Sequence, residues 1–307
     1  QPIPNADETA WIICNGEIYN YQALREELLA DGVKFRCQSD TEVILHLYEK
    51  YGIDCVHKLR GMFAFAIWDS RSGELFCARD RLGQKPFYYW TEGREFAFGS
   101  EIKALLALDP GLRKLHKPAL DQYLSLRIIC SPDSMFEGIR KLAPAHLLTF
   151  SMEKGLSIRR YWDLEFEPKH EGSESELLDE LESRLVDALR LHMVSDVPVG
   201  AFMSGGLDST IVVAMLMKHV CREPLQTFTM GLPYRQFDEA PAARMVAEKY
   251  GTQHFEQVIE PSLLRTLPEL VWHLDEPSDP LSICTYLLSE FAARRVKVVL
   301  GGDGGDE

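Results

Sequence analysis

The residues best suited to chemistry form a short run, 204–209, between an apolar strand pattern and a helix pattern. The run consists of Ser204, Gly205, Gly206, Leu207, Asp208 and Ser209. Paired glycines allow a tight turn that points successive backbone N–H groups into one concavity, and the next helix adds its positive end. Such a loop accepts a di- or triphosphate, and Asp208 suits Mg²⁺ beside phosphate oxygens. The alternative is an ordinary strand–helix turn in which the Asp caps the helix.

A second glycine-rich run ends the sequence, directly after the strand pattern VKVVL. It consists of Gly301, Gly302, Asp303, Gly304, Gly305, Asp306 and Glu307. Ligands of open α/β sheets bind at the carboxyl ends of strands, so we expect both runs at the same sheet edge. There the second run would bring a second magnesium carboxylate and a close backbone contact to a nucleotide. A flexible surface loop is the alternative.

In the first half of the chain, Asn15 and Gly16 follow the strand pattern WIIC. An Asn-Gly pair is often only a turn. The functional alternative is an oxyanion hole made by the Asn15 side-chain amide and the Gly16 N–H. Asp40 lies beside the start of a helix pattern, where it either pairs with a substrate ammonium or lies at the positive helix end without further function.

Other reactive-looking residues are expected to be structural. The Arg-Asp-Arg run at 79–81 is typical of an ion-pair network at a hairpin end. Cys14, Cys37 and Cys77 lie in or beside strand patterns and are expected to be buried thiols. The histidines form no HxxxH or HExxH pattern, so a metal-hydrolase site is not supported.

The elements that must position these residues divide the chain into two modules. Residues 11–150 hold short, aromatic-rich strand patterns with turns between them, typical of an antiparallel sheet of hairpins, and a helix pattern with Thr41 as N-cap and Gly52 as terminator. The polar stretch 163–175 is the linker candidate. Beyond it a long helix pattern leads into regular strand–helix alternation, typical of a parallel sheet covered by helices.

Composition narrows the class of protein. The 307 residues include 33 Lys and Arg against 47 Asp and Glu, a net charge of −14, which argues against a nucleic-acid binder. Seven cysteines without a CxxC pair suit a reducing cytosol rather than a disulfide framework or zinc site. No apolar run approaches the ~20 residues of a membrane span, so we expect no membrane insertion and a cytoplasmic location. The first residue, Gln1, and the polar final loop indicate an internal fragment of a longer protein.

Several motifs resemble one family. NGEIYN, SDTEV, GMFAFAIWD and ARDRLGQKPFYY, followed by SEIKAL, resemble the class II amidotransferase domain of glutamine-hydrolysing asparagine synthetases of the B type. DVPVGAFMSGGLDS, TFTMGL, FDEAPAARMVAEKYGT and GGDGGDE resemble the synthetase domain of the same family. The resemblance covers nearly the whole chain.

The resemblance implies a fold and a division into domains. Residues 1–162 would form an α+β N-terminal-nucleophile glutaminase sandwich that lacks its N-terminus. After the linker 163–175, residues 176–307 would form an α/β PP-loop domain (an ATP-pyrophosphatase with a Rossmann-like parallel sheet) that lacks its C-terminal part.

The resemblance also implies an activity. It is the ATP-dependent amidation of aspartate with ammonia from glutamine, through a β-aspartyl-AMP intermediate, with release of AMP and pyrophosphate. ATP and Mg²⁺ would be the cofactors, and a homodimer is the protein assembly considered. Two alternatives stay open. One is a paralogue that amidates another carboxylate in cell-envelope polysaccharide chemistry, and the other is a non-catalytic nucleotide-binding protein.

The resemblance assigns roles residue by residue in the first domain. Asn15, Gly16 and Glu17 match the glutamine-binding and oxyanion positions, and Asp40 matches the acid that holds the glutamine amino group.

In the second domain the resemblance implies an ATP site in which Met203 and Met230 line the adenine pocket. The full set is Met203, Ser204, Gly205, Gly206, Leu207, Asp208, Ser209, Met230, Gly301 and Gly302. Asp208 and Asp306 match magnesium ligands, and Asp303 matches a proton-shuttling acid that acts in formation of the intermediate.

Three departures from the family pattern carry expectations. The family's nucleophile is a cysteine at the mature N-terminus, and its glutamine-binding arginine also lies upstream of this chain, so we expect this chain alone not to hydrolyse glutamine. The family's distal lysine lies beyond Glu307, so we expect weak or no adenylation. Asp303 stands where the family usually has Glu, which would set the carboxylate roughly 1–1.5 Å back.

Overall fold

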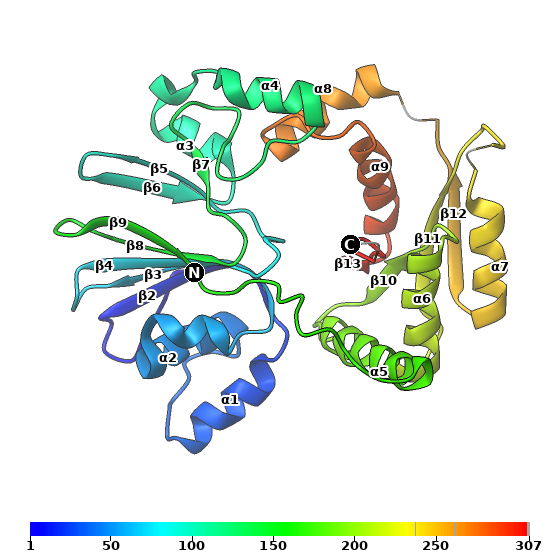
Figure 1. Cartoon of the computed structure of the whole chain (residues 1–307), viewed down its shortest axis with the longest axis horizontal. Coiled ribbons are helices and arrows are strands. Elements are labelled where there is room, and N and C mark those ends of the chain that lie inside the picture. The colour runs from blue at the N-terminus through cyan, green and yellow to red at the C-terminus, as the bar shows by residue number, and fades with distance from the viewer. Residues whose placement is uncertain (237, 261, 306–307) are drawn as a thin grey trace. The chain divides into compact units, whose positions relative to one another are not determined.

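The computed structural model divides the chain into two compact units (Figure 1). The described residues are 1–236, 238–260 and 262–305. Unit 1 comprises Gln1–Glu167 and Trp272–Ser278, and unit 2 comprises Pro168–Val271 and Asp279–Glu307. None of the helices in the described part of the chain combines the length and the apolarity that a membrane crossing requires.

Unit 1 is built on two antiparallel sheets, one of six strands in the order β1-β2-β3-β4-β8-β9 and one of three in the order β6-β5-β7. Its strands are β1 (Ile3–Pro4), β2 (Ala10–Ile18), β3 (Gly61–Asp69), β4 (Glu74–Arg79), β5 (Tyr88–Glu92), β6 (Glu95–Gly99), β7 (Arg140–Lys141), β8 (His146–Ser151) and β9 (Gly155–Arg160). Its helices are α1 (Tyr21–Ala30), α2 (Asp40–Tyr51), α3 (Ile102–Leu108) and α4 (Lys117–Leu126), with 3-10 helices η1 (Gly52–His57) and η2 (Pro110–Leu112).

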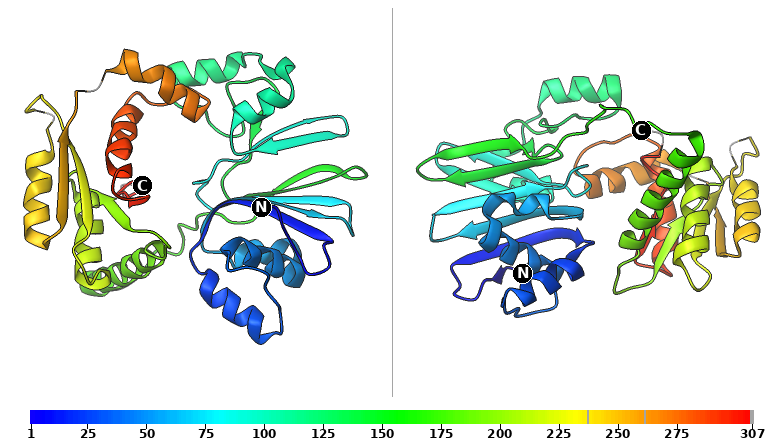
Figure 2. Two further views of the ribbon diagram at one scale, coloured as in Figure 1. Left: turned by 180° about the vertical axis from the view of Figure 1, so that it is seen from behind. Right: turned by 60° about the horizontal axis from the view of Figure 1, so that its bottom comes forward.

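The six-stranded sheet has an apolar core on each face. Side chains alternate along a strand, so Phe63 and Phe65 of β3 pack with α1 and α2 on one face, whereas Ala64 and Ala66 pack toward the smaller sheet on the other. Figure 2 shows α1 and α2 together on one side of the larger sheet. On the outer face of the smaller sheet, Ile102 and Leu105 of α3 pack against Tyr88 and Trp90 of β5, so the two layers of strands lie between two layers of helices.

The expected hairpins are present, but they do not form one sheet. β3 pairs with β4, and β5 pairs with β6, in different sheets. Asp80 explains the change of sheet, because its buried carboxylate accepts the N–H groups of Leu82, Gln84 and Lys85 at 3.1, 2.9 and 3.0 Å. Arg79 donates to three further backbone carbonyls around this loop. Residues 79–81 hold this loop through hydrogen bonds to the backbone, which differs from the ion-pair network predicted for the run.

Helix α2 begins two residues earlier than expected. Ser39, not Thr41, is the N-cap: its backbone is extended, and its hydroxyl accepts the N–H of Thr41 at 3.2 Å. Asp40 is therefore the first helical residue, and Thr41 is buried in the first turn. Gly52 ends the helix with φ +60, as predicted.

Unit 2 holds a four-stranded parallel sheet in the order β12-β11-β10-β13, which confirms the predicted strand–helix alternation. Its strands are β10 (Val199–Phe202), β11 (Gln226–Gly231), β12 (Gln253–Val258) and β13 (Val298–Leu300). Its helices are α5 (Glu174–His192), α6 (Leu207–Met215) with the π-helical turn η3 (Leu216–Val220), α7 (Ala240–Tyr250), α8 (Leu263–Leu274, in unit 1 from Trp272 on) and α9 (Ser282–Ala293). Helices α5 to α7 pack on one face of the sheet, and α9 packs on the other.

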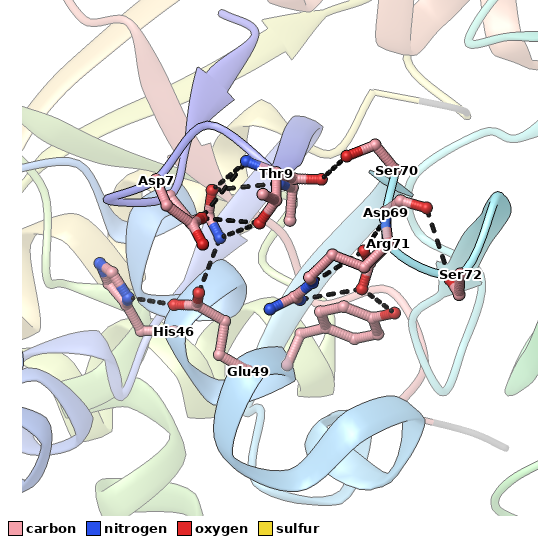
Figure 3. Close-up of polar contacts among 11 residues, drawn as sticks. Asp7, Thr9, His46, Glu49, Asp69, Ser70, Arg71 and Ser72 are labelled. Carbon is pink, nitrogen blue, oxygen red and sulfur yellow. Dashed lines mark hydrogen bonds and ion pairs between the residues drawn. The ribbon is translucent and has the colours of Figure 1, made fainter.

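A buried polar network in unit 1 joins the turn before β2 to helix α2 (Figure 3). The His46 ring lies between two carboxylates, with Nδ1 2.8 Å from Glu49 and Nε2 3.4 Å from Glu42. Glu49 also accepts the side-chain amide of Asn5 at 2.8 Å, and the Asn5 oxygen accepts the N–H of Thr9 at 2.9 Å. Because His46 and Glu42 are both buried, neither can lose its partner without a cost.

The network shifts the pKa values of its members. Burial alone would lower the pKa of His46, but hydrogen bonds to Glu49 and Glu42 outweigh burial and raise it. Hydrogen bonding to His46 lowers the pKa of Glu49. Burial would raise the pKa of Glu42, but the N–H groups of Arg36 and Cys37 donate to it, and the net pKa is lowered.

We predict that replacing His46 with Gln removes a pH-dependent part of the stability of unit 1. A raised folded-state pKa means that the stabilisation is complete below the ordinary histidine pKa of about 6.5 and is lost as pH rises through the folded-state value. The unfolding free energy of the unchanged protein should therefore fall by on the order of 1 kcal/mol above pH ~6.5, and that of the variant should not. All five tryptophans belong to unit 1, so urea unfolding followed by tryptophan fluorescence measures it.

The matched control is His57→Gln, since His57 is exposed and outside the network. It should keep the pH slope of the unchanged protein. An equal slope for the unchanged protein and His46→Gln would contradict the assignment.

Candidate functional site

In unit 2, residues 204–209 form the tight turn between β10 and α6. Gly205 has φ +82, and a Cβ there would lie 2.7 Å from atoms of Ala242 and Ala243 in α7. The turn can approach α7 so closely only because this residue lacks a side chain. Gly206 is the N-cap of α6, with an ordinary φ of −68.

The two serines hold the turn in shape. The hydroxyls of Ser204 and Ser209 are 3.0 Å apart, the Ser204 hydroxyl accepts the N–H of Gly206 at 3.2 Å, and the Ser209 hydroxyl accepts the N–H of Ser204 at 3.3 Å. The Leu207 side chain is exposed, so this residue contributes its backbone at the first position of α6. The turn is thus preorganised by its own side chains.

The second glycine-rich run packs directly against the first. A Cβ at Gly302 would lie 2.7 Å from the Ser209 nitrogen, and one at Gly305 would lie 2.6 Å from Cγ of Asp208. Strands β10 and β13 are parallel neighbours, so both runs leave the sheet at the same edge. The prediction that the two runs share one edge is confirmed.

The two runs enclose a cavity of about 510 Å³ in unit 2. The predicted residues that line it are Met203, Ser204, Gly206, Leu207, Asp208, Ser209, Met230, Gly301, Gly302 and Asp303. Gly205 lies outside the lining and acts on the turn, and Asp306 is not among the described residues. The Met203 side chain is buried in the core cluster with α5 to α7, so little of it faces the cavity.

Six lining residues were not predicted from the sequence, and two of them, Phe202 and Thr229, come from β10 and β11. Glu239 precedes α7, and Cys284, Thr285 and Leu288 come from α9. No glycine or charge pattern marks α9 as part of a site, and it reaches the cavity only because it covers the second face of the sheet.

The oxygen donors around the cavity suit a hard cation. Asp208, Ser209 and Asp303 line it with two carboxylates and a hydroxyl, the donor types that Mg²⁺ prefers. Glycine at 305 leaves the space beside the Asp208 carboxylate clear of a side chain. Among the described residues no group of three His, Cys, Asp or Glu is close enough to hold a metal, so Asp208 would need ligands from a bound phosphate or from Asp306.

In unit 1, Asn15 and Gly16 lie inside a strand, so the expectation of a turn after WIIC is wrong. The nine-residue β2 pairs with β3 along its whole length, with Asn15 opposite Ala64 and Gly16 opposite Phe63. Gly16 has φ +156, and a Cβ there would lie 2.1 Å from the Met62 carbonyl oxygen. The Asn-Gly pair therefore permits a close backbone approach within the sheet rather than a reversal of the chain.

The Asn15 side chain lines a second cavity, of about 270 Å³, walled mainly by aromatic and small residues of the two sheets. Its amide nitrogen donates to the Ser100 hydroxyl at 3.1 Å. Asp40 lies on the other flank of β2, where its carboxylate accepts the N–H of Ile18 at 2.8 Å. Gly16, Glu17 and Asp40 do not line this cavity.

Cys14 precedes Asn15, and its side chain packs with the helix-facing core. Burial, followed by the charge of Asp40, raises the pKa of its thiol to about 12. Cys77 is fully buried, and Cys37 is half-buried with its thiol 2.9 Å from Glu42. Cys14 is therefore protonated near neutral pH and unsuited to act as a nucleophile.

Comparisons with known proteins match both halves of the chain. Residues 1–162 match the family described as a glutamine amidotransferase domain, and residues 180–307 match the family described as asparagine synthase.

Two relatives illustrate the likeness. Asparagine synthetase [glutamine-hydrolyzing] 1 of Bacillus subtilis is 38% identical over 100% of this chain and 48% of its own length. A putative asparagine synthetase [glutamine-hydrolyzing] 2 of Methanocaldococcus jannaschii is 42% identical over 96% of this chain and 58% of its own. The chain spans about half the length of the curated relatives it matches.

A solved structure, glutamine phosphoribosylpyrophosphate amidotransferase from B. subtilis, matches with a TM-score of 0.38 and 16% identity over 88% of this chain and 52% of its own. A score this low supports no conclusion about the present chain.

We predict that Gly205→Ala destabilises the β10–α6 turn far more than Gly206→Ala does. The first change adds overlap with α7 at a left-handed φ and should cost about 2 kcal/mol or more. The second keeps an ordinary φ and meets only the Ser204 hydroxyl at 3.2 Å. Hydrogen–deuterium exchange of peptides spanning β10 and α6 measures the difference, expected to be roughly thirtyfold in rate. Equal exchange in the two variants would show that contact with α7 does not fix the turn.

Proposed function

The chain belongs to the family that joins a glutamine amidotransferase domain to an asparagine synthase domain, and we propose that its native protein makes asparagine. Ammonia from glutamine would replace the activated hydroxyl of the aspartate side chain at the expense of ATP. One observation carries the proposal. The turn 204–209, whose backbone N–H groups suit a phosphate, meets the run 301–305 around Asp208 in one cavity. The same chain also carries an amidotransferase domain.

The domain division that we propose is 1–162 for the amidotransferase, 163–175 for the linker and 176–307 for the synthetase. Two antiparallel sheets in unit 1 support an N-terminal-nucleophile sandwich, and the turn at the end of a parallel strand in unit 2 supports a PP-loop domain. A cytoplasmic location and a homodimer complete the proposal.

At the nucleotide cavity, the chain's own residues would bind and orient ATP. The N–H groups of the turn and the hydroxyls of Ser204 and Ser209 would face phosphate oxygens. Met230 would border the base, together with the small part of Met203 that faces the cavity. Asp208, with Asp306, would hold Mg²⁺, which neutralises charge on the phosphates when bound. The aspartate carboxylate then attacks the α-phosphorus with loss of pyrophosphate, and ammonia attacks the acyl carbon with loss of AMP.

At the amidotransferase cavity, Asn15 and Gly16 would stabilise the oxyanion formed on the glutamine amide. Glu17 would take part in glutamine binding and Asp40 would hold the glutamine amino group, both from outside the lining of this cavity. Cys14 has no part in this chemistry, since its pKa is raised to about 12 and its side chain packs with the helix-facing core.

Asp303 favours a second candidate function, the amidation of a different carboxylate. It lines the nucleotide cavity, and one of its carboxylate oxygens lies 2.6 Å from the place of a Cβ on Gly301, so the short side chain bends back over its own loop. A shorter acid leaves more room for an acceptor larger than aspartate.

Two substitutions in the native protein should separate the two half-reactions. Asp208→Asn should abolish ATP turnover and leave glutamate release intact, because it removes the charge that binds Mg²⁺. Asn15→Ala should slow glutamate release by ~100-fold, a typical loss for one oxyanion donor, while ammonia-dependent AMP formation survives. Glutamate release and AMP formation are measured separately for each variant.

The control for charge is Asp196→Asn, since Asp196 is exposed and precedes β10 at the opposite end of the strand from the turn. It should change neither rate. If Asp208→Asn also ended glutamate release, or Asn15→Ala also ended ammonia-dependent AMP formation, the assignment of these residues would be wrong.

A further inference from the structure

A short piece of the asparagine synthase match belongs to unit 1. Residues 180–307 match asparagine synthase, yet Trp272–Ser278 packs within unit 1. This segment carries two consecutive acids, Asp275 and Glu276, whose side chains are only 7% and 9% exposed. Buried carboxylates require partners, and unit 1 supplies them.

Glu276 anchors the segment. Its carboxylate accepts the Met135 N–H at 2.5 Å and lies 2.6 Å from the Lys141 ammonium. Lys141 in turn donates to the Ile129 carbonyl at 3.0 Å. The segment is further held where the Tyr123 hydroxyl donates to the Ser278 carbonyl at 3.3 Å. These contacts fix where the neighbouring Asp275 must lie.

Asp275 directs its carboxylate at the turn that leads into α3. It follows the last residue of α8 with φ +65, a left-handed conformation that Asp tolerates better than most residues. One oxygen accepts the Ile102 N–H at 2.6 Å, and the other lies 2.8 Å from the Lys103 ammonium. The start of α3 is therefore held by an acid that lies 173 residues from Ile102 in the sequence.

The same turn meets Asn15. Ser100, two residues before Ile102, accepts the Asn15 amide N–H at 3.1 Å, and both side chains line the cavity of unit 1. Moving the turn would move the group that orients this amide. Small displacements matter here, because an oxyanion donor works only when aimed at the developing charge.

We propose that Asp275 is a positioning residue for the Asn15 amide, acting through the turn formed by residues 100–103. Glutamine hydrolysis then depends on a residue outside the amidotransferase match. The inference rests on the proposed function, in which Asn15 stabilises the oxyanion. Asp275 contacts neither glutamine nor the oxyanion, and it acts by fixing the orientation of the Asn15 amide.

A double-mutant cycle on glutamate release by the native protein tests the proposal. Asp275→Ala and Ser100→Ala should each lower kcat about tenfold and leave KM for glutamine within about twofold, since neither is assigned to hold the substrate. Because both act through the same amide, the double variant should be no slower than Ser100→Ala alone. Asp275→Asn keeps an oxygen for the Ile102 N–H and tolerates the same φ, so it should give an intermediate kcat.

Glu101→Gln is the matched control. Glu101 belongs to the same turn and pairs with Lys103 at 2.8 Å, but its side chain is 59% exposed. Its kcat should equal that of the unchanged protein. If Asp275→Ala does not fold, Asp275→Asn completes the cycle with Ser100→Ala.

Three results would overturn the proposal: an unchanged kcat in the Asp275 variants, multiplicative losses in the double variant, or a rise in KM without a loss of kcat. If the unchanged protein releases no glutamate from glutamine, the proposed function fails and the inference fails with it. If it does release glutamate and the variants match it, the inference alone fails.

Discussion

The candidate nucleotide cavity exists because backbone segments approach one another so closely that no side chain fits between them. Gly205 lets the turn after β10 touch α7, and Gly302 and Gly305 let the run after β13 touch Ser209 and Asp208. Each approach is shorter than a Cβ would allow, so the cavity exists in this form only with glycine at these positions. Because β10 and β13 are parallel neighbours, the sheet delivers both runs to one edge, and the glycines let them close on each other.

In unit 1, a glycine likewise permits a close approach of two backbone segments, here two neighbouring strands. Gly16 lets β2 pair continuously with β3, and this continuity places alternate side chains on opposite faces. Asn15 and Cys14 both belong to the lining of the cavity between the sheets, but the Cys14 side chain packs with the helix-facing core. The orientation of the Asn15 side chain is therefore set by strand alternation and by the Ser100 hydroxyl, which accepts its amide N–H.

Local patterns predict much of this structure, and long-range contacts account for what they miss. Local sequence patterns suffice to predict the alternation of strands and helices in unit 2. They also suffice to predict that its two glycine-rich runs share one edge of the sheet. The separation of the hairpins into two sheets does not, because it depends on the hydrogen bonds of Asp80 across a loop. The strand conformation of Asn15 depends on its partner β3, and the place of Asp275 depends on Ile102, far away in the sequence.

The cavity around Asp208 is proposed to activate the side chain of aspartate. The most direct measurement is AMP formation by the native protein with Mg-ATP and ammonia, with and without aspartate. We expect AMP to appear only with aspartate and in equal amount with asparagine. AMP that forms only with another carboxylate would contradict aspartate as the acceptor and favour the second candidate function. No AMP with any carboxylic acid would contradict the assignment of the cavity as a site of carboxylate activation.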